Sequence, residues 1–412
     1  MKIAHAECVI SPEVGTLVAG YGPRDVSVRI HDDLKLSVLL MDDGERKGAL
    51  LGFDLLGLDE EFILKIASDA GAILGCPAEN VIVTCTHTHS GPHTRSLCRV
   101  SADRKYIAGL YEKSAAAVRE ASAAWREVDT YFYSCVCGEN YNRRYADGSN
   151  RGKYLPFHRS LEPLASGFRD RELGMLIFTA PGEPHPLGTV INFAAHPLAT
   201  HAMGLGSHRI SADFPGMLRD IMADNSCWCV FAQGAAGDMF PRDAECGMEA
   251  ARRFADNLAI AAMRGFCDAI RNPDLYLMKD PKIRTSVEKV KIHVRQDLDA
   301  VKRELPALAG KKEAETRVHL FALGDVCLVG VPGELLAELG QEIKWHSPFR
   351  RTFILYNSTG YLSYICHANA FVAGGYETGS SHIKPYDGFQ IVSSAVEGMR
   401  KLHEPFPEER EA

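Results

Sequence analysis

The sequence predicts an α/β fold in which layered mixed β-sheets are flanked by helices. Two patterns predict this class. Short apolar runs typical of buried strands alternate along the chain with longer segments of helical periodicity. Several of these runs end where Gly or Pro breaks the chain, and His or Asp stands at the break. Because ligands bind at the carboxyl ends of strands in open α/β sheets, we expect the active site there.

These periodicities place the elements in chain order, and no internal repeat is visible in the sequence. Strands are expected at residues 3–10, 34–41, 49–56, 80–86, 131–137, 173–179, 188–193, 227–233, 275–293 (one or two), 316–323, 326–331 and 352–357. Helices are expected at residues 59–74, 103–125, 213 onward (with Asp213 as N-cap), 244–270, 294–308, 333–345 and 387–401. The two longest expected loops are 145–172 and 359–381.

Composition limits the classes of function. The 412 residues are 46% hydrophobic and 24% charged, as is usual for globular proteins. The net charge of −7 and the lack of a basic cluster argue against nucleic acid or an anionic membrane surface as partner. No segment approaches the about 18 apolar residues of a membrane span, and the start lacks the apolar core of a signal peptide. We therefore expect a cytoplasmic protein with no stable membrane insertion.

The chain is expected to form one domain. That domain covers residues 1–404, and a frayed acidic tail covers residues 405–412. The 12 cysteines are scattered, and close pairs such as Cys227 and Cys229 lack zinc-knuckle spacing. We expect them to be reduced and mostly buried, as in a cytosolic protein.

The segment Val81–Thr94 carries the clearest functional pattern. An apolar run leads to His87 and His89, and a Ser-Gly-Pro turn follows. Residues two apart on a strand face the same side, so both imidazoles should meet at one strand end. Neutral imidazole is the commonest metal ligand. The alternative is that both histidines simply bond to neighbouring carbonyl groups.

Other strand ends carry similar groups. His196 follows an apolar run, and Glu377 stands among glycines. Two histidines and one carboxylate with an open position are typical of catalytic zinc. Asp54, inside an apolar run, is either a turn-forming residue or a partner that orients a metal-bound histidine. The adjacent pair Arg143 and Arg144 could clamp a carboxylate or an oxyanion, or remain a solvated pair.

Taken together, these motifs resemble the N-terminal catalytic domain of the neutral (alkaline, non-lysosomal) ceramidases. The resemblance runs from about residue 8 to residue 400, with its motifs in the same order. The most specific of them is the histidine motif Thr-His-Thr-His-Ser-Gly-Pro. The segments that carry the resemblance are 86–92, 192–197, 142–143, 237–241 and 375–377.

The resemblance implies an amide-bond hydrolase with Zn²⁺ held by His87, His196 and Glu377, although Mn²⁺ or Fe²⁺ also suit such ligands. It implies that His89 and Arg143 bind or polarise the scissile carbonyl. Asp238 lies at the position of the family's nucleophile loop and is the third expected catalytic residue. In the implied reaction, metal-bound water attacks, the metal and the arginine stabilise the oxyanion, and a nearby group protonates the leaving amine.

Three features depart from the family pattern. Phe240 replaces the family's Ser, Tyr386 is the sole candidate for the family's further Tyr ligand, and no immunoglobulin-like segment follows. We therefore expect an amidase acting on a small soluble substrate in a narrow polar pocket closed by residues 145–172 and 201–209. The alternatives are a true ceramidase or N-acyl-lipid amidase with a wide apolar groove, and a non-catalytic metal- or ligand-binding relative. A homo-oligomer is left open.

Overall fold

The computed structural model describes residues 1–20, 25–97, 100–144, 167–201, 208–242, 244 and 246–403. It has the mixed α/β architecture that the sequence predicts, built mainly from three sheets. The predictions made for residues 145–166, 202–207 and the tail 405–412 lie outside the described residues.

The first sheet is a three-stranded antiparallel meander extended by a parallel strand. Strands β1 (Lys2–Val9), β3 (Lys35–Asp42) and β4 (Lys47–Phe53) pair in order. Helix α1 (Glu60–Leu74) then crosses to β5 (Val81–Cys85), which is parallel to β4. Helix α2 (Arg104–Ser122) follows, and Asp103 caps it by accepting from the Tyr106 amide. The short β6 (Arg126–Glu127) extends the β1 edge.

The second and third sheets have the same topology. The second contains the meander β7 (Asp129–Val136), β9 (Glu172–Thr179) and β10 (Pro186–Phe193), then α4 (Asp213–Asp224), β12 (Trp228–Gln233) and α5 (Met248–Arg271). The third contains β14 (Ile283–His293), β15 (Glu313–Leu323) and β16 (Val326–Gly330), then α8 (Ala337–Trp345), β18 (Arg351–Leu355) and α11 (Asp387–Leu402). The chain thus repeats one topological unit three times, although its sequence shows no repeat.

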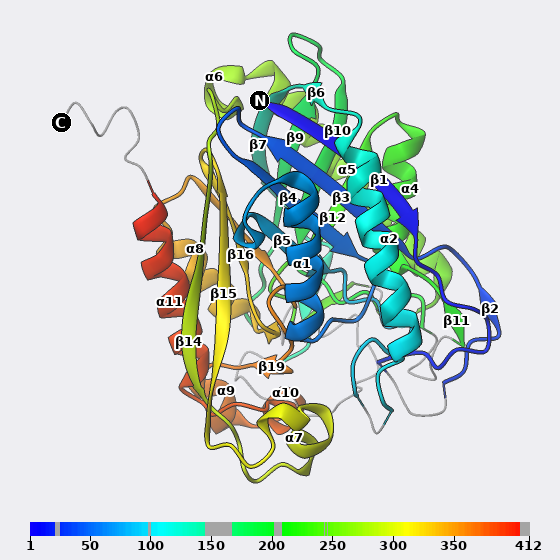
Figure 1. Cartoon of the computed structure of the whole chain (residues 1–412), viewed down its shortest axis with the longest axis vertical. Coiled ribbons are helices and arrows are strands. Elements are labelled where there is room, and N and C mark those ends of the chain that lie inside the picture. The colour runs from blue at the N-terminus through cyan, green and yellow to red at the C-terminus, as the bar shows by residue number, and fades with distance from the viewer. Residues whose placement is uncertain are drawn as a thin grey trace.

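Period-two alternation explains how the three sheets pack. In β3, Leu36, Val38 and Leu40 face α1 and α2, whereas Leu39 and Met41 face the centre of the molecule. The other two sheets alternate in the same way, and the inner faces of all three share one apolar core. In Figure 1, α1 and α2 (blue to cyan) cover the first sheet, α4 and α5 (green) lie on another side, and α8 and α11 (orange to red) lie on a third.

This arrangement brings strand ends from all three units together. The Gln233 side-chain amide at the end of β12 donates to the Thr86 carbonyl after β5 (3.3 Å). The Tyr356 amide after β18 donates to the Gln233 carbonyl at the end of β12 (3.0 Å). The loops after these strands therefore converge, as expected for an active site at carboxyl ends.

Short elements lie in the connections between the main strands and helices, and three expectations are corrected. The expected loop 359–381 contains β19, α9 and α10, and the expected helix 294–308 is broken into α7 and a 3-10 turn. The helix expected from residue 333 begins only at Ala337, after β17. Their bounds are β2 (Arg29–Ile30), β8 (Asn140–Asn142), β11 (Arg209–Ile210), β13 (Met239–Pro241), β17 (Glu334–Leu335), β19 (Tyr364–Ile365), η1 (Ala78–Asn80), η2 (Pro306–Leu308), α6 (Pro273–Tyr276), α7 (Asp299–Glu304), α9 (Ala368–Ala373) and α10 (Tyr376–Ser380).

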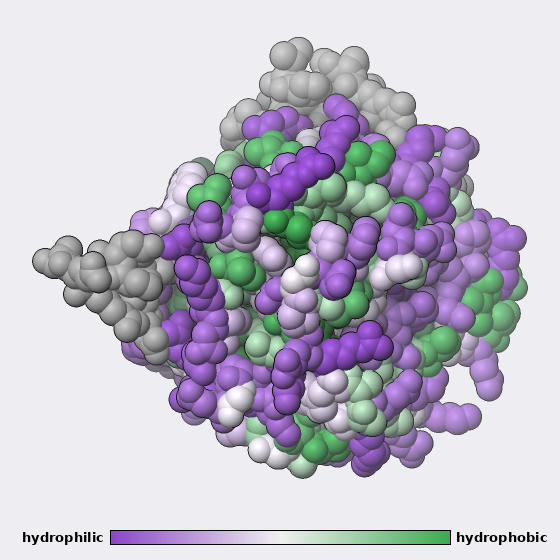
Figure 2. Space-filling model, turned by 90° about the horizontal axis from the view of Figure 1, so that it is seen from above, coloured by the Kyte–Doolittle hydropathy of each residue, from purple (hydrophilic) through white to green (hydrophobic). Residues whose placement is uncertain are grey.

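The distribution of polar side chains on the surface and the state of the cysteines agree with what the composition predicts. Figure 2 shows polar side chains over most of the face seen from above, with apolar side chains in small separate patches. All 11 cysteines in the described part of the chain are free thiols. Within that same part, every helix is too short or too polar to cross a bilayer.

Candidate metal centre

His87 begins the site at the end of β5. Its backbone φ of 70° lies in the left-handed region, which is uncommon for a residue with a side chain and recurs at functional sites. The amide of His87 donates to the Leu55 carbonyl (2.9 Å), which fixes the turn. The imidazole Nδ1 lies 2.6 Å from the Leu56 carbonyl oxygen. The Asn357 side-chain nitrogen lies 2.9 Å from the same Nδ1. A proton on Nδ1 would donate to the Leu56 carbonyl and leave the Nε2 lone pair facing the site.

His196 repeats this arrangement from the second unit, in the loop after β10. Its amide donates to the Met239 carbonyl (2.9 Å), and its Nδ1 lies 3.2 Å from the same oxygen. Its Nε2 is buried and makes no hydrogen bond. A carbonyl bound to Nδ1 and a bare Nε2 aimed inward are typical of a metal-ligating histidine.

His89 is the third imidazole of the cluster. Its Nε2 lies 3.3 Å from the His87 Nε2. One nitrogen each from His87, His89 and His196 lie within 4.8 Å of one another, so the three could hold a metal ion. Burial lowers the pKa of His87 to about 4, and burial together with the other imidazoles holds the pKa of His89 well below its ordinary value. At neutral pH His87 and His89 are therefore uncharged, as metal binding requires.

Glu334 supplies a carboxylate that the sequence analysis missed. It follows β16, and its Oε2 lies 3.7 Å from the His87 Nε2 and 3.4 Å from the His196 Nε2. The Tyr356 hydroxyl donates to Oε2 (2.8 Å), and the Tyr361 hydroxyl donates to Oε1. Burial alone would raise the pKa of Glu334, but His87, His196 and the Tyr361 hydroxyl outweigh burial and hold it well below its usual range. The carboxylate is therefore ionised.

One sequence signal could have found Glu334. It stands in Val331-Pro-Gly-Glu334, just after an apolar strand, and we assigned it instead to the start of a helix. His196 occupies the corresponding loop in the second unit, after β10. Comparing the two strand ends would have pointed to an acidic group at residue 334.

Glu377 has different neighbours. The carboxylate is fully buried in α10; its Oε1 lies 2.5 Å from the Arg143 Nε and its Oε2 lies 2.7 Å from the Arg144 Nη1. Burial would raise the pKa of Glu377, but the two guanidinium groups outweigh it and lower this pKa. The group that could hold a metal consists of His87, His89 and His196, and neither Glu377 nor Glu334 is a member of it. The carboxylate that faces the imidazoles is Glu334, and our proposal below moves the ligand role there.

Arg143 lies between the Glu377 carboxylate and the histidines. Its Nη2 donates to the Gly237 carbonyl (3.0 Å). Its guanidinium carbon lies 4.7 Å from the ring centre of Phe240, and that ring lies 5.5 Å from the His196 ring. Phe240, which stands where the family has Ser, is therefore a packing surface between Arg143 and His196.

Asp238 is buried beside the site but faces away from the imidazoles. Its Oδ2 accepts from the Asn142 side chain (2.7 Å), and its Oδ1 accepts from the Ala337 amide at the start of α8 (2.8 Å). Its backbone carbonyl accepts from the Arg143 amide (2.8 Å). Asp238 thus connects β13, α8 and the Arg143 loop. The turn after β12 leads into the short strand β13.

The structure shows the contacts of three further residues that the sequence analysis singled out, namely Asp54, Asp213 and Tyr386. Asp54 accepts from Arg219 Nη2 (2.7 Å) and from the Lys35 amide (2.8 Å), which agrees with the turn-forming alternative. Asp213 is the first residue of α4 rather than its N-cap. Tyr386 is 75% exposed, whereas the buried tyrosines that contact Glu334 are Tyr356 and Tyr361.

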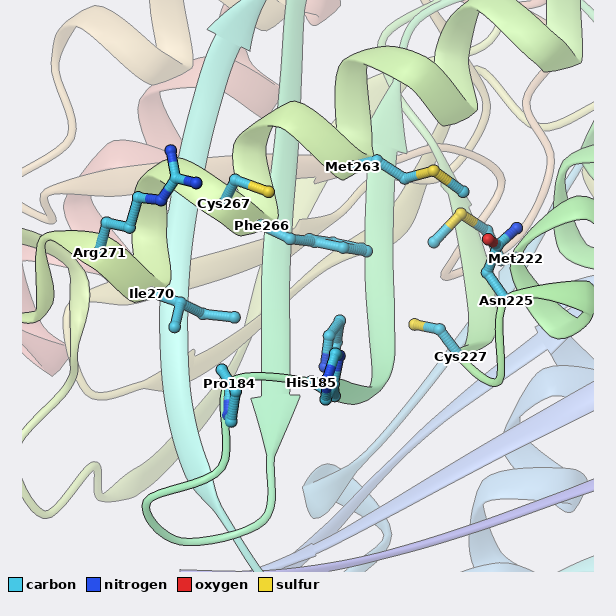
Figure 3. Close-up of a pocket in the computed structure, with 11 residues that line it drawn as sticks. Pro184, His185, Met222, Asn225, Cys227, Met263, Phe266, Cys267, Ile270 and Arg271 are labelled. Atoms are coloured by element: carbon cyan, nitrogen blue, oxygen red, sulfur yellow. The ribbon is translucent and has the colours of Figure 1, made fainter.

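A separate cavity of about 390 Å³ lies at the opposite end of the second sheet. Figure 3 shows that Met222, Met263 and Phe266 line it, with Cys267 and Arg271 from α5 at one side. Its lining contains His185 but no carboxylate. The cavity therefore lacks the donor set that converges around His87.

The fold and this site define a layered α/β protein with a buried cluster able to hold a metal. No protein-family model and no curated protein sequence matches the chain. Solved structures do match it. One is neutral ceramidase from Pseudomonas aeruginosa, with 16% identity and a TM-score of 0.78 over 98% of this chain and 75% of that one. Another is a ceramidase complexed with C2, with 17% identity and a TM-score of 0.78 over 98% of this chain and 76% of that one. The chain therefore has the neutral ceramidase fold, which agrees with the sequence resemblance.

Proposed function

We propose that the protein is a metal-dependent hydrolase of amide bonds, with zinc as its ion. His87, His196 and Glu334 are the proposed ligands, and His89 lies within reach of the same position. The observation that carries this proposal is the convergence of two inward-facing Nε2 atoms, each with Nδ1 on a carbonyl, upon one ionised carboxylate. These donors suit Zn²⁺, and also Mn²⁺ or Fe²⁺.

A bound ion of this kind would polarise a carbonyl and lower the pKa of water towards neutrality. The protein supplies the rest. The carbonyls of Leu56 and Met239 keep the imidazoles of His87 and His196 in one tautomer, and the Tyr356 hydroxyl holds the Glu334 carboxylate in place.

Arg143 and His89 are the proposed groups that contact the scissile carbonyl. The Arg143 guanidinium is permanently charged and is fixed before substrate arrives, so it can stabilise negative charge that develops on the carbonyl oxygen. We propose a positioning role for Asp238 instead of the catalytic role first assigned to it, because both of its oxygens hold neighbouring elements together.

The proposed substrate is a small soluble N-acyl compound or amide, and the proposed compartment is the cytoplasm. The 11 free cysteines of the described residues support a reducing compartment. The second candidate function is hydrolysis of an N-acyl lipid, which the likeness to neutral ceramidase favours. The third, a non-catalytic metal-binding protein, is favoured by Phe240 at the position of the family's Ser.

The test is an amide-hydrolysis assay of zinc-loaded protein. Short N-acyl amines in buffer and an N-acyl sphingoid base in detergent micelles are compared, with His87→Ala as the control. We expect turnover of the short amides that His87→Ala abolishes. Turnover of the micellar lipid alone would support the ceramidase, and no turnover with one zinc bound per chain would support the binding protein.

A further inference from the structure

A buried ion cluster lies beside the proposed metal centre. Glu377, from α10, is fully buried and gives one carboxylate oxygen to each of two consecutive arginines, Arg143 and Arg144. Isolated buried charges are costly, but here both oxygens are hydrogen-bonded to cations. The cluster holds two guanidinium groups around one carboxylate, and Arg143 packs on the Phe240 ring, which contacts the His196 ring. The cluster therefore fixes a cation at the edge of the site and also satisfies the charge of Glu377.

The two arginines of this cluster have different tasks. Arg144 is 3% exposed, and its Nη2 donates to the carbonyls of Gly374 (2.9 Å) and Ala370 (3.3 Å), which ties down the end of α9. Arg143 is 11% exposed and faces the imidazoles across the Phe240 ring. Arg144 therefore stabilises the local structure around α9, whereas Arg143 is the cation presented to the site.

The orientation of the Arg143 guanidinium is fixed at two points. Glu377 holds Nε at 2.5 Å, and the Gly237 carbonyl holds Nη2 at 3.0 Å. A planar guanidinium held at two of its nitrogens cannot rotate in its plane. The rings of Tyr376 (5.2 Å) and Tyr364 (5.4 Å) lie around its carbon and limit tilting. Removing the Glu377 contact would release one of the two fixed points.

We infer that Glu377 is a positioning residue that aims Arg143 at the reacting carbonyl, and that it is not a metal ligand. The inference rests on the proposed function, because the carbonyl is the group that Arg143 would contact. Its physical basis is that a preorganised donor must keep its geometry to act on the transition state, and small displacements have large effects on rate.

The first test needs no substrate. Glu377→Gln and Glu334→Gln are purified in parallel, and metal per chain is measured by elemental analysis. The visible spectrum of the Co²⁺-loaded proteins is recorded beside it. We expect Glu377→Gln to keep the metal content and Co²⁺ spectrum of the unaltered protein, whereas Glu334→Gln loses both. Equal metal loss in the two variants would overturn the inference.

The second test is a double-mutant cycle in the amidase assay. We expect Glu377→Gln to lower kcat about tenfold with little change in KM, and to cause no further loss in the Arg143→Ala background. Additive losses in the double variant would contradict action through Arg143. Asp43→Asn is the control, since Asp43 is a buried carboxylate in the turn between β3 and β4, where it accepts from the Ile283 amide (2.7 Å), away from the strand ends that carry the site. It should lower the melting temperature comparably and leave kcat unchanged.

Two further experiments keep the inference testable if folding or activity fails. If Glu377→Gln does not fold, Glu377→Asp preserves the charge, but its shorter side chain cannot reach both arginines, so the same loss of kcat with full metal content is expected. If no amide is hydrolysed, the proposed function fails and a crystal structure of Glu377→Gln decides the inference. A displaced Arg143 guanidinium supports it, and an unmoved guanidinium overturns it.

Discussion

Two glutamates of this protein are equally buried and have opposite surroundings. Glu334 lies among imidazoles and tyrosine hydroxyls, whereas Glu377 lies between two guanidinium groups. The tyrosine hydroxyls stabilise the Glu334 carboxylate without cancelling its charge, and an imidazole can release its proton when a metal binds, so in our proposal Glu334 offers its negative charge to a divalent cation. The charge of Glu377 is already balanced by permanent cations. The comparison teaches that burial and ionisation do not identify a metal ligand, but the charge of the neighbours does.

The largest expected effect concerns the metal. Glu334→Gln should weaken zinc binding by more than about 100-fold, because it removes a metal ligand. Loss of a group that only orients a ligand typically weakens metal binding by about 10–100-fold. Competition with a chromogenic chelator measures the affinity. Glu342→Gln, at a surface position on α8, is the control. Unchanged affinity in Glu334→Gln would break the distinction between the two glutamates.

The next effect concerns the Glu377 side of the comparison. Arg143→Lys should lower kcat about 100-fold with full zinc content, because an ammonium keeps the charge but cannot contact Glu377 and Gly237 as a planar fork. Steady-state kinetics together with elemental analysis test this. Loss of zinc in Arg143→Lys would mean that the two sides of the site do not act separately.

The smallest effect is a pH dependence of stability. The pKa of folded Glu377 lies below its unfolded value near 4.5, so its stabilising contribution is complete above that pH and is lost as the pH falls through the folded pKa. Glu377→Gln lacks this contribution, and its unfolding free energy should therefore fall less steeply than that of the unaltered protein between pH 5 and pH 3. Urea unfolding of both metal-free proteins at several pH values measures the difference. Parallel curves would contradict the ion-cluster account.

The sequence predicted those parts of the site that depend on local pattern. His87 and His89 lie at the end of an apolar run, and His196 lies at the end of another, so strand periodicity and chain breaks were enough to place them together. The fold class followed from the same periodicities. The threefold topology did not, because the units share a hydrophobic pattern and an order of elements but no recognisable residues.

The partners of the acidic residues could not be read from the sequence. Glu334 follows a strand and Glu377 stands among glycines, and both patterns suit a ligand. Only tertiary contacts with Arg143 and Arg144, more than 200 residues away along the chain, distinguish Glu377 from Glu334. The helices within 359–381 could not be predicted for the same reason. Arg144 holds the end of α9 through hydrogen bonds to backbone carbonyls, and no local sequence pattern predicts these contacts.

Anomalous X-ray diffraction at the zinc edge, from crystals of the zinc-loaded protein, tests the central claim most directly. We predict a single strong peak within coordination distance of the His87 Nε2, the His196 Nε2 and the Glu334 carboxylate, with Glu377 still bound to Arg143. A peak coordinated by Glu377, or the absence of a peak among the imidazoles at full zinc loading, would contradict the account.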